Sequence, residues 1–175
     1  MIQPQNMNMV SNYITAGIAL TTGLQVLETF RPIKGRGLTI LFGDFLMIGS
    51  IPWIISVMIK RGTIMEILLP VAVGILLAIP LILTTKIAAT SDGTIKFKKN
   101  IFLYLFLIGI PFLRRNVGFT EFFKHYTIFL PNTHIPDIEL MIVMYVTVIV
   151  LNIQLWRLAS YLKFRKAKRD LNSIN

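Results

Sequence analysis

The sequence predicts an all-α integral membrane protein, a single membrane domain in which five transmembrane helices form a bundle. Three observations predict this class. Hydrophobic residues make up 54% of the 175 residues and charged residues only 15%, whereas soluble domains average about 45–50% and about 25%. Five apolar runs approach the roughly 20 residues that a spanning helix needs. Lysine and arginine gather in alternate gaps between these runs.

The five predicted helices are separated by breaks in the apolar pattern. They lie near residues 10–30, 38–59, 64–84, 101–118 and 138–158. Arg31 precedes Pro32, so it is pushed out of the α region and ends the first helix. Gly35 and Gly37 permit a tight turn into the second helix. Asp137 is placed to serve as the N-cap of the fifth helix.

The basic residues predict the orientation of the chain. Thirteen of the eighteen Lys and Arg follow the first and third helices or lie at the C-terminal end, which includes a basic tail at 159–175. Because positive residues concentrate in cytoplasmic loops, we expect the N-terminus outside and the C-terminus inside. The net charge of +10 therefore indicates anionic lipids of the inner face as partners. It does not indicate nucleic acid, which would need one soluble basic surface.

Two segments between the helices have predicted structure of their own. The segment 86–99 predicts a short cytoplasmic β-hairpin, because Asp92-Gly93 suits a two-residue turn and apolar and basic residues alternate after it. The hairpin either rests on the inner membrane surface or offers a docking edge to a partner. In 119–130, apolar residues recur at helical spacing. They predict an outer amphipathic helix, either an interfacial anchor or a substrate-binding lid.

Charged residues inside apolar runs are the main indication of a functional site, because each costs at least about 2.5–3.5 kcal/mol at a helix centre. We expect an inner polar cluster of two acids and three cations that enter at a similar depth. Its members are Glu28, Arg31, Asp44, Lys86 and Arg157, with Gln25 and Gln154 nearby. The cluster is either a set of paired charges that fixes helix register or a cation or proton relay.

The pair Arg114 and Arg115 forms a second candidate site. It follows only thirteen residues of the fourth helix counted from Ile101. Either the helix is short and both side chains reach the outer interface, or they stay buried beside an acid such as Glu66 or Glu121. A third interpretation is a contact with an anionic ligand or lipid head group.

Residue types that carry much of catalytic chemistry are missing or sparse. The chain has no cysteine, which excludes thiol redox chemistry and covalent haem attachment by the chain itself. Its two histidines, His125 and His134, have no third zinc ligand in register. Neither a nucleotide-binding loop nor a nucleophile elbow is present. We therefore expect no cofactor, no metal and no enzymatic activity.

Two stretches resemble a known family. The first is Leu83-Thr84-Thr85-Lys86, followed by Asp92-Gly93-Thr94-Ile95 and Lys98-Lys99, and the second is Trp156-Arg157-Leu158-Ala159-Ser160-Tyr161-Leu162-Lys163-Phe164. Between about residues 70 and 168 the chain resembles the CcdC-like small multi-pass membrane proteins. The resemblance implies the bacterial cytoplasmic membrane and, by the family's name, a setting in cytochrome c biogenesis. It implies no catalytic residue.

Two classes of function remain. One is a non-enzymatic membrane accessory or regulatory protein, linked to cytochrome c biogenesis or another envelope assembly system. Its partner would be a membrane protein or a second copy of the chain. The other class is a small transporter or channel subunit that uses Glu28 and Asp44.

Overall fold

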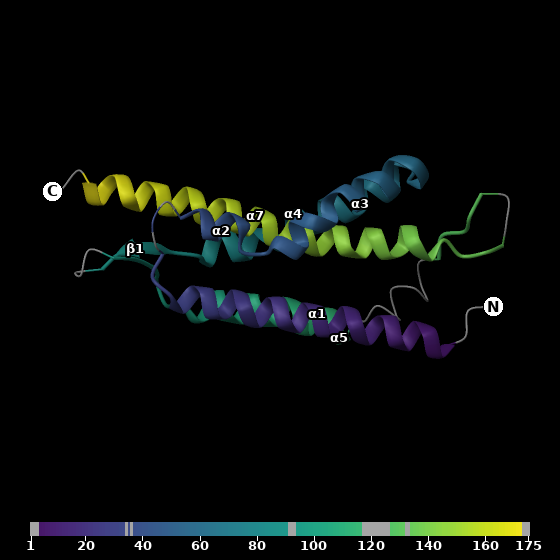
Figure 1. The fold of residues 1–175 in the computed structure, drawn as a ribbon, viewed down its shortest axis with the longest axis horizontal. Helices are drawn as coiled ribbons and strands as arrows, with labels where there is room; N and C mark the ends of the chain where they lie inside the picture. Colours follow the sequence, from purple (N-terminus) through teal and green to yellow (C-terminus); the bar gives the residue numbers. More distant parts are fainter. Residues whose placement is uncertain are drawn as a thin grey trace.

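The chain folds into long helices and one small sheet (Figure 1). The structure is a computed structural model and describes residues 4–33, 35, 37–90, 94–116, 127–131 and 134–172. The elements are α1 (Pro4–Phe30), α2 (Leu38–Phe42), α3 (Phe45–Arg61), α4 (Ile64–Thr84), β1 (Ile87–Ala89), β2 (Ile95–Phe97), α5 (Ile101–Asn116) and α7 (Ile138–Asn172). The predominantly helical fold predicted from the sequence is confirmed.

The long helices lie roughly side by side and α7 is the central element (Figure 1). α4, α3 and α2 pack on α7, and β1 contacts it as well. α1 packs on α5, and α5 in turn contacts α4. The two chain ends lie at opposite ends of the molecule. α7 therefore meets most of the other elements, and a side chain on it can reach several of them.

The predicted hairpin at 86–99 is confirmed. β1 and β2 pair antiparallel, with Ile87 opposite Phe97 and Ala89 opposite Ile95, while residues 91–93 of the turn lie outside the described residues. The link after α1 joins this sheet, because Ile33 N donates to Ile95 O at 2.9 Å. Gly37 closes the link with φ 72°, in the left-handed region that favours glycine.

The second predicted helix, 38–59, is not continuous. It breaks at Gly43 and Asp44 into α2 and α3. Pro52, Pro70 and Pro80 lie within α3 and α4 without ending either helix. The break lies away from these prolines and coincides with the long-range contact of Asp44 described below.

The basic tail predicted at 159–175 is not separate from the last helix, because α7 continues to Asn172. Its apolar face packs on the sheet and on α2: Phe164 clusters with Ile40 and Ile95.

The outer helix predicted at 119–130 does not extend to residue 130, so the C-terminal part of this prediction is wrong. Residues 127–130 are not helical, and Asp137 N donates to Ile128 O at 2.8 Å. Residues 119–126 lie outside the described residues.

Large apolar side chains are exposed along the helices. They include Leu20, Leu24, Leu27, Phe30, Phe42, Phe45, Ile59, Leu68, Leu76, Leu83, Leu105 and Ile108. Among the described residues, two helices are long and apolar enough to cross a membrane, Ile64–Thr84 and Ile138–Asn172. A soluble monomer rarely exposes such large apolar surface, so the surface of this chain suits contact with lipid.

Candidate functional site

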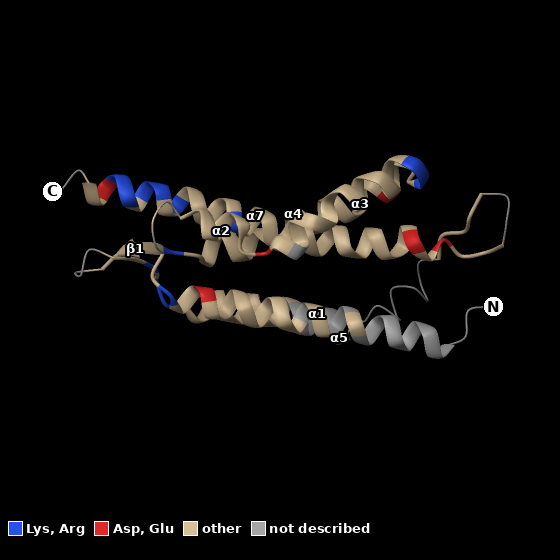
Figure 2. Ribbon diagram, in the orientation of Figure 1, with Lys and Arg blue, Asp and Glu red and all other residues tan. Residues whose placement is uncertain are grey.

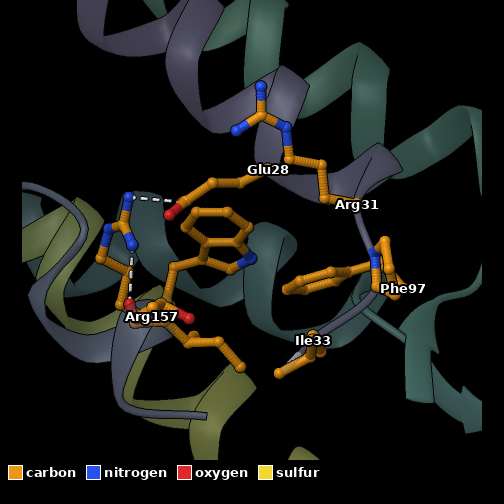
Figure 3. A pocket seen from close by; sticks show the side chains of 9 residues that line it. Glu28, Arg31, Ile33, Phe97 and Arg157 are labelled. Atoms are coloured by element: carbon orange, nitrogen blue, oxygen red, sulfur yellow. Dashed lines mark hydrogen bonds and ion pairs between the residues drawn. The ribbon is translucent and has the colours of Figure 1, made fainter. Parts of the chain in front are cut away.

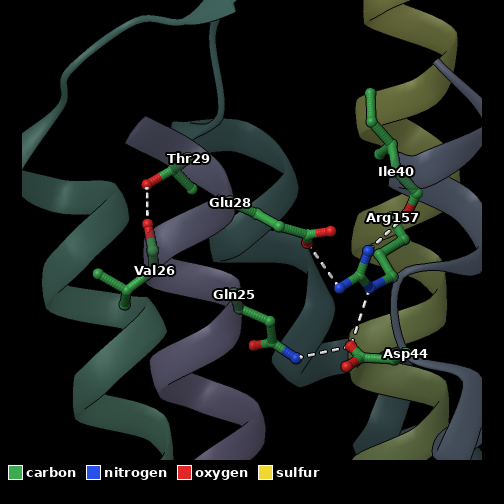
Figure 4. Close-up of polar contacts among 7 residues, drawn as sticks. All are labelled: Gln25, Val26, Glu28, Thr29, Ile40, Asp44 and Arg157. Carbon is green, nitrogen blue, oxygen red and sulfur yellow. Dashed lines mark hydrogen bonds and ion pairs between the residues drawn. The ribbon is translucent and has the colours of Figure 1, made fainter. Parts of the chain in front are cut away.

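The break between α2 and α3 creates the most polar point of the interior. Asp44 has φ −105° and ψ 64° and sits at the N-cap position of α3, but its side chain makes no capping bond. Its carboxylate turns instead toward α7 (Figure 4). A helix that ends leaves backbone carbonyls without donors, and the Ile40 carbonyl accepts its hydrogen bond from a side chain of α7.

That side chain is Arg157, which is buried with 2% of its side chain exposed. Its Nε donates to Asp44 Oδ2 at 2.9 Å and its Nη2 donates to Glu28 Oε2 at 2.7 Å. Its Nη1 donates to Ile40 O at 2.6 Å. Each guanidinium nitrogen therefore has an acceptor, as Figure 4 shows. We call Glu28, Asp44 and Arg157 the arginine clamp.

The arginine clamp joins three parts of the chain. Glu28 comes from α1, Asp44 from the α2–α3 break and Arg157 from α7. Gln25, one turn before Glu28, adds a hydrogen bond from its Nε2 to Asp44 Oδ2 at 3.0 Å. Removing one partner of a buried ion pair costs about 3–5 kcal/mol, because it leaves an uncompensated charge. The clamp therefore holds α1 and the helix break to α7.

Gly43 provides the space that the clamp occupies. A Cβ atom at this position would lie 2.7 Å from Nη1 of Arg157 and closer still to Oε1 of Glu28. It would also lie 2.8 Å from the carbonyl oxygen of Thr39. A backbone carbonyl cannot move aside cheaply, so a side chain at Gly43 would push the two charged groups apart.

A pocket of about 580 Å³ lies beside the clamp. Its lining comes from the end of α1, the link after it, α2, β2 and α7: Glu28, Arg31, Pro32, Ile33, Thr39, Ile40, Phe97, Trp156 and Arg157. Figure 3 shows Phe97 and Ile33 on the side of the pocket opposite Glu28 and Arg157. Small-molecule sites usually measure about 300–1,000 Å³ and are mostly apolar with a few polar groups. The pocket fits that description.

A second polar network lies on the same side of α7. Trp156 Nε1 donates to Thr85 Oγ1 at 2.8 Å, and Lys163 Nζ donates to the carbonyls of Thr85 and Ile82. These carbonyls lie at the C-terminal end of α4, where a cation is favourable. The network therefore fixes the end of α4 and the start of the hairpin to α7.

Residues 7–170 match the family model described as CcdC protein. The chain belongs to the CcdC protein family. The match covers nearly the whole chain, including α1, α2 and α3, and so extends beyond the resemblance seen from about residue 70 to 168. No curated protein and no solved structure shows detectable similarity. The family match thus includes all three residues of the arginine clamp.

In this CcdC family member, the structure brings together three of the five residues expected in the inner cluster. Glu28, Asp44 and Arg157 form the clamp, whereas Arg31 lies exposed at the pocket beside Glu28. Lys86 is exposed at the start of the hairpin, and neither acid is bonded to it in the described part of the structure. The predicted cluster is therefore smaller and more buried than expected.

The remaining sequence predictions about polar residues have mixed outcomes. The side chains of Arg114 and Arg115 lie outside the described residues, so the outer anion or lipid contact stays a prediction. Asp137 caps α7 as expected, because its Oδ1 accepts from Leu140 N at 3.1 Å. Gln154 does not join the clamp; its Nε2 is buried and has no partner among the described residues.

Some residues of the site were not predicted from the sequence. The Ile40 carbonyl became an acceptor only because the helix breaks, and no side-chain pattern signals that. Gly43 carried a signal, because a glycine directly before the one aspartate inside a predicted span points to a bend. Trp156 and Lys163 lie seven positions apart, which places them on one face of α7, and this spacing could have predicted their shared contact with Thr85.

Proposed function

We propose that this CcdC family member is a non-enzymatic multi-pass accessory protein of the bacterial cytoplasmic membrane. Five helical passes cross the bilayer, with α2 and α3 forming one broken pass. The exposed apolar side chains along the helices support this arrangement. The distribution of charge supports it as well: Lys and Arg lie along the C-terminal end of α7, and a smaller basic group lies at the far end of α3 (Figure 2). The basic C-terminal end of α7 would face the cytoplasm.

The observation that carries the proposal is the bonding of Arg157, each of whose three guanidinium nitrogens donates to an acceptor. Both acids expected in the inner polar cluster, Glu28 and Asp44, are bonded to this one buried guanidinium. A proton or cation relay needs acids that can release and rebind their charge partner. Acids that are paired with a permanent cation at 2.7 and 2.9 Å instead stabilise the packing of the helices that carry them. These ion pairs fix one arrangement of the helices, and this favours an accessory role over transport.

The inner end of the molecule supplies the surface for partners. Exposed basic residues on the hairpin side and on α7 include Lys98, Lys99, Arg165, Lys166, Lys168 and Arg169. Such residues attract the anionic inner leaflet and acidic segments of other proteins. The family name links the chain to cytochrome c biogenesis. Because the chain has no cysteine, it would act there by contact and not by thiol exchange.

Crosslinking in living cells tests the accessory role. A photo-reactive residue at Arg165, on the exposed face of α7, should capture a discrete membrane protein or a second copy of the chain. The same residue at Ile59, exposed at the far end of α3, is the matched control for position. Deletion of the protein should also lower the amount of haem-stained c-type cytochrome. A chain that captures nothing at either position and leaves cytochrome levels unchanged would refute the proposal.

A transporter or channel subunit is the second candidate, favoured by one observation. Glu28 keeps 35% of its side chain exposed and lines the pocket, so it has the access to solvent that a relay requires. Ion or solute flux should be measured in vesicles with the native chain, E28Q and D44N. Flux above that of empty vesicles that falls in both variants would support transport. No flux above empty vesicles would refute it.

A further inference from the structure

The pocket beside the arginine clamp contains charges that the clamp does not use. Each of the three guanidinium nitrogens of Arg157 already donates to an acceptor, and its positive charge is paired with Glu28 and Asp44, so the occupant is assigned to other groups. Arg31 is exposed, and its backbone N–H donates to the Glu28 carbonyl at 3.2 Å, but its guanidinium makes no hydrogen bond or ion pair within the described residues. Glu28 uses Oε2 for Arg157, and its Oε1 accepts no hydrogen bond from the described residues. The pocket therefore offers one cation and one carboxylate oxygen.

The rest of the lining is apolar and aromatic. Phe97 and Trp156 lie together with ring centroids 6.3 Å apart, and Ile33, Ile40 and Pro32 complete the apolar walls. An occupant that satisfies this lining carries both a positive and a negative group and an apolar portion. A purely anionic molecule would supply no donor to Oε1 of Glu28, and a purely cationic one would be repelled by Arg31.

The position of the pocket narrows the class of occupant. Arg31 directly follows α1, on the side of the molecule where the hairpin and the basic end of α7 lie (Figure 2). Phe30, Leu38 and Phe42, on the elements next to the pocket, are 46–61% exposed. In the proposed membrane orientation, this is the level of the inner head groups, with apolar surface directed toward the acyl chains.

We propose that the pocket binds one zwitterionic phospholipid with a primary amine, of the phosphatidylethanolamine type. Its phosphate contacts Arg31, its ammonium group donates to Glu28, and its glycerol region lies against Phe97 and Trp156. The inference rests on the membrane placement of the proposed function. An ammonium with N–H groups is required because a carboxylate oxygen recognises it by charge-assisted hydrogen bonds. A choline head group has no N–H to donate.

Tryptophan fluorescence provides a direct test, because the chain has only two tryptophans and Trp156 lines the pocket. In a W53F chain, Trp156 is the single reporter. The full-length chain is placed in phosphatidylcholine vesicles that contain a small, equal fraction of phosphatidylethanolamine, phosphatidylglycerol or phosphatidylcholine with brominated acyl chains. Bromine quenches indole on contact. We expect the brominated phosphatidylethanolamine to quench Trp156 most strongly.

Variants at the pocket identify the site. R31Q should reduce the preference for phosphatidylethanolamine by about two- to five-fold, the order expected for a partly screened ion pair. T39F adds a ring to an exposed lining position and should reduce the preference by filling the pocket. R165Q, an exposed arginine outside the pocket, is the matched control and should leave the preference unchanged.

Three outcomes would overturn the inference. They are equal quenching by the three lipids, a preference that survives both R31Q and T39F, and displacement of the lipid by equimolar phosphoethanolamine, which would indicate a water-soluble ligand. Extraction of the membranes with carbonate separates these outcomes from a failure of the proposed function. A chain that the wash releases is not an integral membrane protein, whereas a retained chain without lipid preference contradicts only the lipid site.

Discussion

Replacement of Arg157 by methionine tests whether the arginine clamp holds the bundle together. R157M keeps much of the side-chain volume but removes the bonds to Asp44, Glu28 and the Ile40 carbonyl. Two acids and a backbone carbonyl then lose their buried partner. Breaking a buried ion pair in this way costs about 3–5 kcal/mol. For a chain of this length, that corresponds to a fall in the melting temperature of about 6–20 °C.

R61M provides the matched control. Arg61 also forms an ion pair, with Glu139 at 2.8 Å, in which both side chains are more than 40% exposed, and a longer contact with the buried Asp137 at 3.4 Å. Exposed pairs contribute about 0–1 kcal/mol, so R61M should shift the melting temperature by a few degrees at most. Thermal unfolding of the purified chains in one detergent measures both. Equal shifts for R157M and R61M would refute the claim that the clamp stabilises the fold.

A compensating variant separates charge from packing. E28Q/D44N/R157M removes all three charges, and neutral replacement of a buried ion-pair network is often tolerated. We expect this triple variant to recover much of the stability lost in R157M. If it is no more stable than R157M, the arginine acts through its packing and its bond to Ile40, and not by neutralising the two acids.

Three further predictions follow from other parts of the molecule. G43A should destabilise the fold by about 1–3 kcal/mol, the usual cost of overpacking, whereas G49A, where an added Cβ meets nothing within 4 Å, should have little effect on the melting temperature. D137A removes the N-cap of α7 and should cost about 0.5–2 kcal/mol in thermal unfolding; a stability equal to that of the native chain would contradict the capping role. A reporter fused after Asn175 should give a cytoplasmic signal, and an external signal would contradict the proposed orientation.

The sequence contained enough information for the helices but not for the break in one of them. Apolar runs located every long helix, and Asp92-Gly93 located the hairpin, because these signals are local. Gly43 and Asp44 sit inside an apolar run that looks continuous, and the break is stabilised by Arg157, 113 positions away along the chain. Residue order alone does not show which face of one helix meets which face of another.

Two other differences have local causes. The basic tail remained helical because apolar residues among its lysines and arginines, such as Tyr161 and Phe164, pack near the hairpin. The charge of this segment obscured that amphipathic pattern. Residues 127–130 of the outer segment are not helical, because Phe129 forms an antiparallel bridge with Pro136. Pro131, directly after the predicted helix, was the available signal.

The arginine clamp also has a consequence for the order of synthesis. The acids of the clamp lie on α1 and at the α2–α3 break, whereas Arg157 lies on α7, which is synthesised after both of them. In the proposed membrane arrangement, a nascent chain carries these two acids in the bilayer without their cation until α7 is inserted, which is unfavourable by several kcal/mol. A chain truncated before α7 would keep that defect permanently. In the proposed membrane arrangement, the arginine clamp therefore forms only after α7 has joined the earlier helices.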